Sequence, residues 1–129
     1  MDKKELIERT GKTAKLYFSS VKDEEKPYSL WREFDKDLAK DMSLYITGTM
    51  YSREKIPHKT RQLVTVAALT SLAKPEELKL HVHAAFNVGC SKEEIAEVMF
   101  QTSIYAGVPA CNTALFVLKT VIKERQEDQ

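Results

Sequence analysis

Apolar residues recur at every third or fourth position through most of this chain, and this period most constrains its fold. The clearest instance is the stripe Trp31, Phe34, Leu38, Met42 and Tyr45. Only four glycines and four prolines occur in 129 residues, so the chain has few of the turns that a many-stranded sheet requires. The pattern therefore predicts an all-α fold.

Turn and capping signals divide this pattern into about six helices joined by short connections. We expect them to begin near residues 2, 27, 57, 75, 91 and 109, with Gly11 interrupting the first. Residues 91–94 read SKEE, a capping box, and Gly89 is expected to end the helix before it. The expected architecture is a compact helical bundle, forming one domain over residues 1–129.

Charge and hydropathy exclude several classes of partner. The formal net charge is +1, so no basic field indicates nucleic-acid binding. The N-terminus lacks the apolar run of a signal peptide, and no stretch approaches the roughly 20 apolar residues of a membrane span. We therefore expect a cytoplasmic protein with neither a nucleic-acid nor a membrane partner.

The two cysteines, Cys90 and Cys111, have twenty residues between them. This spacing makes neither a CxxC redox pair nor a zinc knuckle. Two unpaired thiols in a reducing compartment are the simplest interpretation. Nothing in the sequence requires a metal or an organic cofactor.

Several segments in the second half of the chain carry a resemblance to a known family. They are KTRQLVT at 59–65, ELKLHVHAA at 77–85, EEIAEV at 93–98 and QTSIYAGVPA at 101–110, with Gly89 and Asn112. In this order and spacing, the core over residues 57–121 resembles the carboxymuconolactone decarboxylase family. The resemblance implies a core helical hairpin, as in alkylhydroperoxidase D, and assembly into a homo-oligomer, a trimer or hexamer, with sites near subunit contacts.

The resemblance also implies one of two chemistries. One branch of the family is a lyase that decarboxylates 4-carboxymuconolactone to an enol-lactone. The other branch, similar to alkylhydroperoxidase D, reduces peroxides or relays electrons with a CxxC pair and a nearby histidine. Its cysteines should lie seven and four residues before the histidine that His81 matches, where this chain has Lys74 and Glu77. The resemblance therefore favours the non-redox branch.

His81 is the first candidate for a catalytic residue. Its position after Leu78 and before Ala85 faces it toward the protein interior. A buried imidazole can act as an acid or base near neutral pH, although a hydrogen-bonded, inert core histidine is the alternative. His83 lies about 200° further round the helix, so it cannot share a metal with His81. We expect His83 and His58 at the surface.

Four further residues are candidates for substrate binding. Arg61 can hold a carboxylate with its two-pronged guanidinium, or form a surface salt bridge instead. Gln62 stands where many relatives carry Glu, and its amide can orient a ligand but cannot exchange a proton. Gln101 and Tyr105 are candidates for the pocket lining, although Tyr105 could instead pack in an interface.

The leading hypothesis is a decarboxylase that acts on a small carboxylated lactone without a cofactor. Arg61 would hold a carboxylate, His81 would protonate the carbon left by CO₂ loss, and Gln101 and Tyr105 would position the ring. A thiol peroxidase or disulfide reductase using Cys90 and Cys111 unconventionally is one alternative. A non-catalytic ligand-binding or assembly protein is the other.

Overall fold

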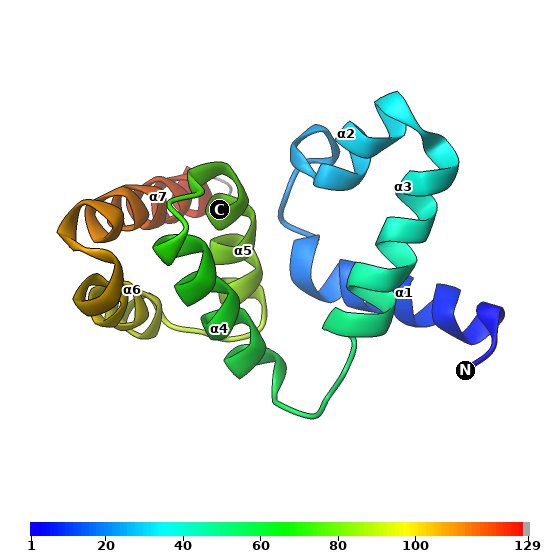
Figure 1. The fold of residues 1–129 in the computed structure, drawn as a ribbon, viewed down its shortest axis with the longest axis horizontal. Coiled ribbons are helices and arrows are strands. Elements are labelled where there is room, and N and C mark those ends of the chain that lie inside the picture. Colours follow the sequence, from blue (N-terminus) through cyan, green and yellow to red (C-terminus); the bar gives the residue numbers. More distant parts are fainter. Residues whose placement is uncertain (128–129) are drawn as a thin grey trace.

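The computed structural model describes residues 1–127, which are helical wherever they form regular structure (Figure 1). In that part of the chain there are seven α-helices: α1 (Lys3–Phe18), α2 (Pro27–Phe34), α3 (Lys36–Ser43), α4 (His58–Ser71), α5 (Pro75–Asn87), α6 (Lys92–Ala106) and α7 (Val108–Glu127). A 3₁₀-helix (Asp23–Glu25) precedes α2, and a π-helix (Leu44–Tyr51) continues α3. The prediction of an all-α fold is confirmed.

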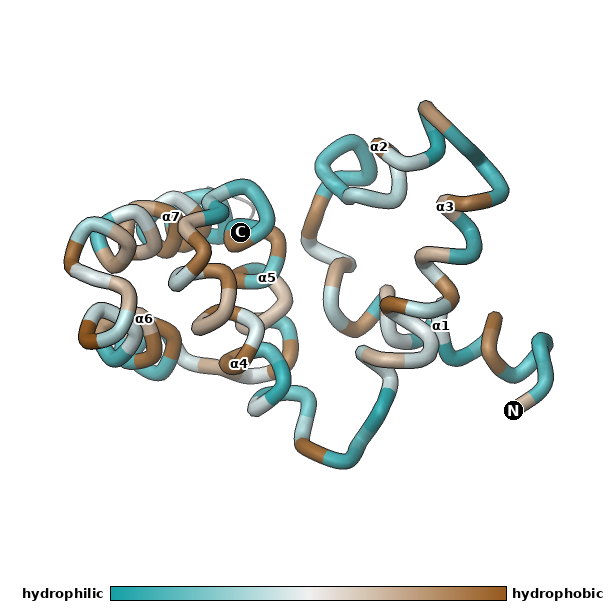
Figure 2. Tube along the Cα trace, in the orientation of Figure 1, coloured by the Kyte–Doolittle hydropathy of each residue, from teal (hydrophilic) through white to brown (hydrophobic). Residues whose placement is uncertain are grey.

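The helices form two lobes (Figure 1). Helices α4 to α7 pack as a bundle around a core that includes Val66, Leu78, Val82, Ile95, Met99 and Val121. Helices α1 to α3 and the π-helix form the N-terminal lobe, which joins the bundle where α1 packs against α5. The tube in Figure 2 shows apolar positions gathered between the helices of the bundle. Within residues 1–127, no helix is both long and apolar enough to cross a membrane.

Helix α1 is continuous, so the expectation that Gly11 interrupts it is wrong. The carboxylate of Asp2 caps its first turn by accepting the N–H of Glu5 at 2.8 Å. Thr10, Thr13 and Tyr17 are buried along one side of the helix. One glycine costs a helix roughly 1 kcal/mol, which a buried face of this length offsets.

The single helix expected from residue 27 is divided at Asp35. Asp35 has an extended backbone, with φ −160° and ψ 106°, and its carboxylate accepts the N–H of Leu38 at 2.9 Å. It therefore ends α2 and caps the start of α3. Beyond α3 the chain widens into the π-helix, a form that occurs often near functional sites.

The predicted signals at the other helix ends are confirmed. The Ser91 hydroxyl accepts the N–H of Glu94 at 3.0 Å, and the Glu94 carboxylate accepts the N–H of Ser91 at 2.9 Å. Gly89 follows the end of α5 with φ +98°, and Gly107 joins α6 to α7 with φ +96°. Both values lie in the region that favours glycine. These local signals fix the turns of the bundle.

Candidate active site

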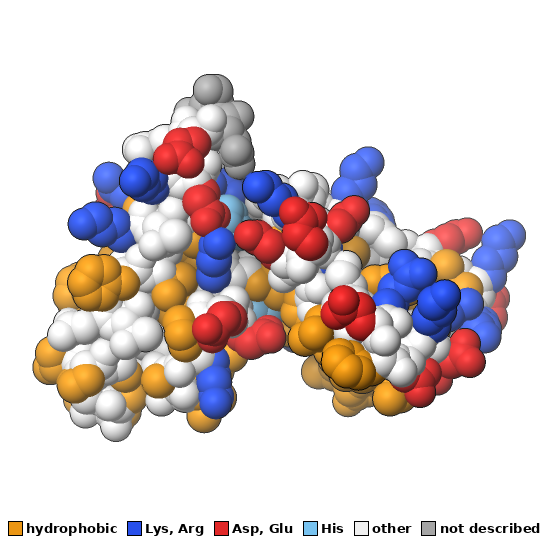
Figure 3. Space-filling model, turned by 90° about the horizontal axis from the view of Figure 1, so that it is seen from above, with side chains coloured by type: hydrophobic (Ala, Val, Ile, Leu, Met, Phe, Trp, Pro, Cys, Tyr) orange, Lys and Arg blue, Asp and Glu red, His pale blue; other side chains and the backbone are white. Residues whose placement is uncertain are grey.

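A cavity of about 580 Å³ lies between the two lobes, and its size suits a small organic ligand. In the space-filling view, histidine side chains are visible in the crease where the lobes meet (Figure 3). Helices α1, α2, α5, the π-helix and the loop around the 3₁₀-helix form its wall. The residues that line the cavity include Phe18, Asp23, Lys26, Tyr28, Trp31, Arg32, Tyr51, Glu77 and His81.

His81 lies on α5 and lines this cavity, with only 5% of its surface exposed. Its Nδ1 lies 3.0 Å from Oε1 of Gln62 on α4. Because an amide oxygen can only accept, Nδ1 carries the proton and donates it. The other ring nitrogen, Nε2, is then a lone-pair acceptor, and no residue within 1–127 hydrogen-bonds to it. The prediction that His81 faces the interior is confirmed.

Aromatic rings hold the His81 imidazole in place. The ring of Phe18 from α1 lies 5.7 Å from the imidazole and nearly perpendicular to it. The ring of Tyr51, at the end of the π-helix, has the same separation and a similar angle. Burial among these groups lowers the pKa of His81 from 6.5 to about 4. At neutral pH the cavity therefore presents a neutral imidazole.

Tyr51 supplies a hydrogen-bond donor beside His81. Burial, and to a lesser extent the charge of Glu77, raises the pKa of its phenol. The hydroxyl therefore keeps its proton at neutral pH. It makes no hydrogen bond to any residue of the described chain, so it is available to a ligand oxygen.

Glu77 lines the cavity one helical turn before His81 on α5. Neither Glu77 nor Tyr51 is among the site residues predicted from the sequence. For Glu77 a signal was present, because residues four apart lie on the same face of a helix. For Tyr51 there was none, since its place depends on how the π-helix packs against α1.

Behind His81, Gln62 belongs to a buried polar cluster. Gln62 is fully buried, and its amide lies beside the phenol of Tyr17, whose pKa burial raises and Gln62 lowers. The Tyr17 hydroxyl lies 2.6 Å from Nδ1 of His58 and 3.3 Å from the carbonyl of Tyr51. The expectation that His58 is superficial is therefore wrong, because it is half-buried against α1. The cluster lies between α1 and α5, and within residues 1–127 the amide nitrogen of Gln62 is buried without a hydrogen-bond partner.

Comparison with known proteins agrees with these features. The model of the carboxymuconolactone decarboxylase family matches residues 36–120, which include Tyr51, Gln62, Glu77 and His81. The chain belongs to the carboxymuconolactone decarboxylase family. The match begins before the core recognised from the sequence, and it includes α3 and the π-helix but not α1 or α2.

Individual relatives support the same family. A 4-carboxymuconolactone decarboxylase of Acinetobacter baylyi is 38% identical over 92 residues, covering 71% of this chain and 69% of the relative. An uncharacterized 15.0 kDa protein of Paracoccus denitrificans is 39% identical over 84 residues, covering 63% and 62%. A nitrosuccinic acid decarboxylase of Metarhizium robertsii is 31% identical over 77 residues, covering 60% and 54%.

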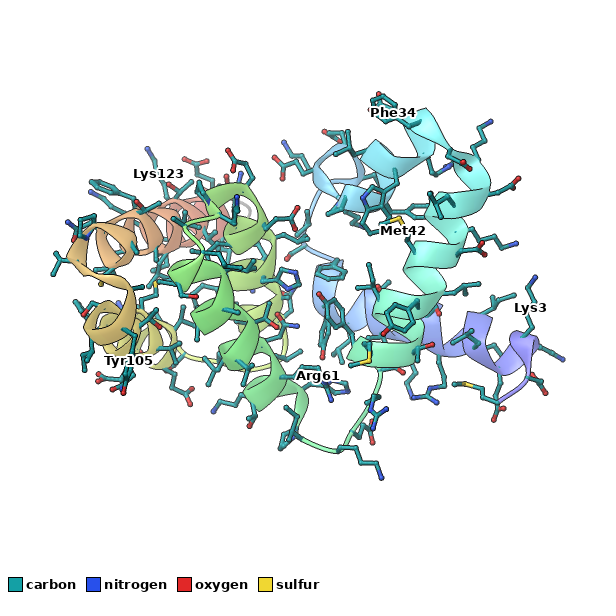
Figure 4. The ribbon with its side chains drawn as sticks, in the orientation of Figure 1. Lys3, Phe34, Met42, Arg61, Tyr105 and Lys123 are labelled. Atoms are coloured by element: carbon teal, nitrogen blue, oxygen red, sulfur yellow. The ribbon has the colours of Figure 1, made fainter. Side chains whose placement is uncertain are left out.

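None of the four predicted substrate-binding residues is among the residues that line the cavity. Arg61 lies in the first turns of α4, where its Nη2 donates to the carbonyl of Arg53 at 3.2 Å (Figure 4). Gln101 and Tyr105 are exposed on α6, Tyr105 by 81%. Figure 4 shows Tyr105 on the side of the bundle away from the N-terminal lobe. Of these four residues, Gln62 is the one that contacts His81 within one chain, through the hydrogen bond from Nδ1.

His83 is buried, with 4% of its surface exposed, so the expectation of a surface histidine is wrong. Its Nε2 lies 3.0 Å from a carboxylate oxygen of Glu124 near the end of α7. Helix α7 covers the side of α5 that carries His83. The periodicity of α5 alone cannot show which of its faces a later helix will cover.

The two cysteines are free and buried. Burial, assisted by the charge of Glu94 and opposed by that of Lys59, raises the pKa of Cys90 to about 11. A thiol with this pKa is protonated at neutral pH and is a poor nucleophile. No group of three His, Cys, Asp or Glu side chains within residues 1–127 could hold a metal ion.

Proposed function

We propose that this protein is a carboxy-lyase that removes CO₂ from a small carboxylated lactone, with His81 as the proton-transfer residue. The observation that carries this proposal is a neutral, buried imidazole in the cavity, with Nδ1 tied to Gln62 and Nε2 left for a ligand. Relatives named for decarboxylation of 4-carboxymuconolactone and of nitrosuccinic acid support the reaction class. We take 4-carboxymuconolactone as the leading candidate substrate.

The first step in this account is proton uptake. A substrate carboxylate about 4 Å from the imidazole favours its cation by roughly 4 kcal/mol at an effective dielectric constant of 20. Since one pKa unit corresponds to about 1.4 kcal/mol, this attraction raises the pKa of His81 by about three units. With this attraction, a pKa of about 4 for His81 in the protein alone becomes compatible with a protonated His81 in the complex.

The second step is loss of CO₂. The bond between the ring carbon and the carboxylate breaks, and its electron pair moves through the ring to the lactone carbonyl oxygen. The Tyr51 hydroxyl can donate a hydrogen bond to that oxygen as its charge develops. Nε2 of His81 then gives its proton to a ring carbon, and the imidazole returns to neutrality. In total, the carboxylated lactone and one proton are consumed, and the decarboxylated lactone and one CO₂ are formed.

Assembly into a homo-oligomer, a trimer or hexamer, is part of this proposal. In one chain Arg61, Gln101 and Tyr105 lie outside the cavity. A substrate-binding role for them requires a second copy that brings them to the site. The exposed positions of Gln101 and Tyr105 suit such a contact.

The test is an ultraviolet assay with 4-carboxymuconolactone, run with the wild type and with His81→Ala. We expect the variant to lose about 10²–10⁴-fold in kcat/KM, the usual contribution of a positioned general acid. Circular dichroism checks that the variant is folded. Full activity in folded His81→Ala would refute the role of His81, and no turnover by the wild type would reject this lactone as the substrate.

The thiol-based alternative receives no support from the site, because Cys90 is held as a thiol. Cys90→Ser should leave the decarboxylase activity within about twofold of the wild type, since Cys90 does not line the cavity. A variant that lost peroxide consumption instead would revive the thiol reaction. A tightly held ligand with no turnover of any substrate would favour the binding-protein alternative.

A further inference from the structure

The cavity is bordered by charged side chains that come from both lobes. The N-terminal lobe contributes Asp23, Lys26 and Arg32, and α5 contributes Glu77. Lys26 and Asp23 form an ion pair at 3.0 Å, so their charges largely cancel. Within residues 1–127, no carboxylate pairs with Arg32. Arg32 is therefore the cation of the cavity that remains available to an anion.

The guanidinium of Arg32 is positioned by an aromatic neighbour. Its central carbon lies 5.8 Å from the centre of the Tyr28 ring, one turn earlier on α2, and both residues line the cavity. Stacking of this kind restrains the guanidinium plane while leaving its N–H groups free to donate. A planar guanidinium with free donors matches the two oxygens of a carboxylate.

The negative charge of Glu77 also favours a ligand whose non-reacting anionic group lies at the N-terminal lobe. Glu77 lies on α5 beside His81, so an anionic group that takes no part in the reaction is disfavoured near α5. The N-terminal lobe, which carries Arg32, favours such a group. Helix α2 lies outside the residues that the family model matches, so nothing in that match assigns a role to Arg32.

We propose that Arg32 binds a second, non-reacting carboxylate of the substrate and thereby selects dicarboxylates over monocarboxylates. This inference rests on the proposed function for the reacting end at His81. The substrate then spans the cavity, with one carboxylate on α2 and the other beside α5. Arg32 takes the anchoring role that the sequence suggested for Arg61.

The test measures binding without turnover. Trp31 is the only tryptophan in the chain and lines the cavity next to Arg32, so its fluorescence reports occupancy, with calorimetry as an independent measure. The probes are trans,trans-muconate, a rigid dicarboxylate, and sorbate, the corresponding monocarboxylate. We expect the wild type to bind muconate about tenfold more tightly than sorbate, the scale of one hydrogen-bonded charge.

Arg32→Gln should weaken muconate binding by about tenfold and remove most of this preference, while Arg32→Lys should retain part of it. Arg53→Gln is the matched control, because Arg53 is exposed, lies outside the cavity, and its replacement removes the same charge. A preference for muconate that survives in Arg32→Gln, or that is absent from the wild type, would overturn the proposal.

The kinetic readout separates this inference from the proposed function. Arg32→Gln should raise KM for the lactone by about tenfold with little change in kcat, since it removes binding shared by the ground and transition states. His81→Ala should lower kcat. If the muconate preference depends on Arg32 while His81→Ala remains active, the role of Arg32 in binding a carboxylate is supported. The role of His81 in proton transfer is then refuted.

Discussion

At the residue scale, the protonation of His81 links the stability of the fold to pH. The pKa of His81 is about 4 in the folded chain and 6.5 in an unfolded one. Between these values the unfolded state binds more protons, so the free energy of unfolding falls as the pH is lowered from 6.5 to 4. Above pH 6.5 both states carry a neutral imidazole, and His81 adds no pH dependence.

We therefore predict that the wild type loses about 3 kcal/mol of stability over this range through His81 alone. His81→Asn cannot be protonated, so it should lack this component while carboxylates titrate in both proteins. Urea unfolding at pH 7, 5.5 and 4.5 measures the difference. Parallel curves for the two proteins would contradict the buried, neutral state of His81.

Gln62 controls the same imidazole from α4. In Gln62→Glu a carboxylate would replace the amide that lies 3.0 Å from Nδ1. An opposite charge at this distance should raise the pKa of His81 by about 1–3 units. Nitrogen-15 NMR titration of the histidines measures this change in the pKa of His81. Gln101→Glu, on the exposed side of α6, is the matched control. An unchanged His81 pKa in Gln62→Glu would show that the contact is absent in solution.

At the element scale, the contact between α1 and the π-helix positions Tyr51 and Phe18. Gly48 makes this contact possible, since a β-carbon there would collide with the hydroxyl of Thr10 and approach Cδ1 of Leu6 within 2.9 Å. Gly11 on the same lobe has no atom within 4 Å of such a carbon. The two glycines therefore offer a matched comparison.

Gly48→Ala should destabilise the protein by about 1–3 kcal/mol, the usual cost of overpacking. Gly11→Ala should be neutral or stabilise it by up to about 1 kcal/mol, because alanine favours a helix. Urea unfolding of both variants tests this difference. Equal stabilities would show that α1 and the π-helix do not pack this closely.

Local signals explain which helices could be predicted from the sequence. Proline and the capping box lie in the turn they specify, so the starts of α2, α5 and α6 were predicted correctly. The break at Asp35 also had a local signal, an N-cap side chain, but the apolar stripe continues across it and favoured one helix. The π-helix depends on contacts with α1, which no local pattern contains.

The candidate site divides in the same way. The inward position of His81 could be predicted, because the faces of a helix follow from its own sequence. Gln62 is a direct partner of His81 because its side chain is buried beside the imidazole. The burial of His83, the position of Tyr51 and the exposure of Tyr105 depend on which helices meet in space. Arg32 was not predicted because the loop and α2 fold back to the cavity wall only in three dimensions.

At the scale of the whole molecule, apolar side chains remain exposed on α6 and α7. They include Phe100, Ile104, Tyr105, Val108 and Phe116, all more than half exposed. A surface of this kind is typical of an interface. We predict a homo-oligomer, which light scattering at micromolar concentration would detect and which Ile104→Glu should weaken. A monomeric wild type would contradict this prediction.

The cavity also depends on the whole molecule, because the residues that line it come from both lobes. We infer that a carboxylate ligand in the cavity favours the protonated form of His81. Calorimetry of muconate binding at pH 6, in two buffers of different ionisation enthalpy, measures the protons taken up on binding. We expect the wild type to take up as much as one proton per ligand, and His81→Asn to take up much less. Binding without proton uptake by the wild type, or equal uptake by both proteins, would contradict it.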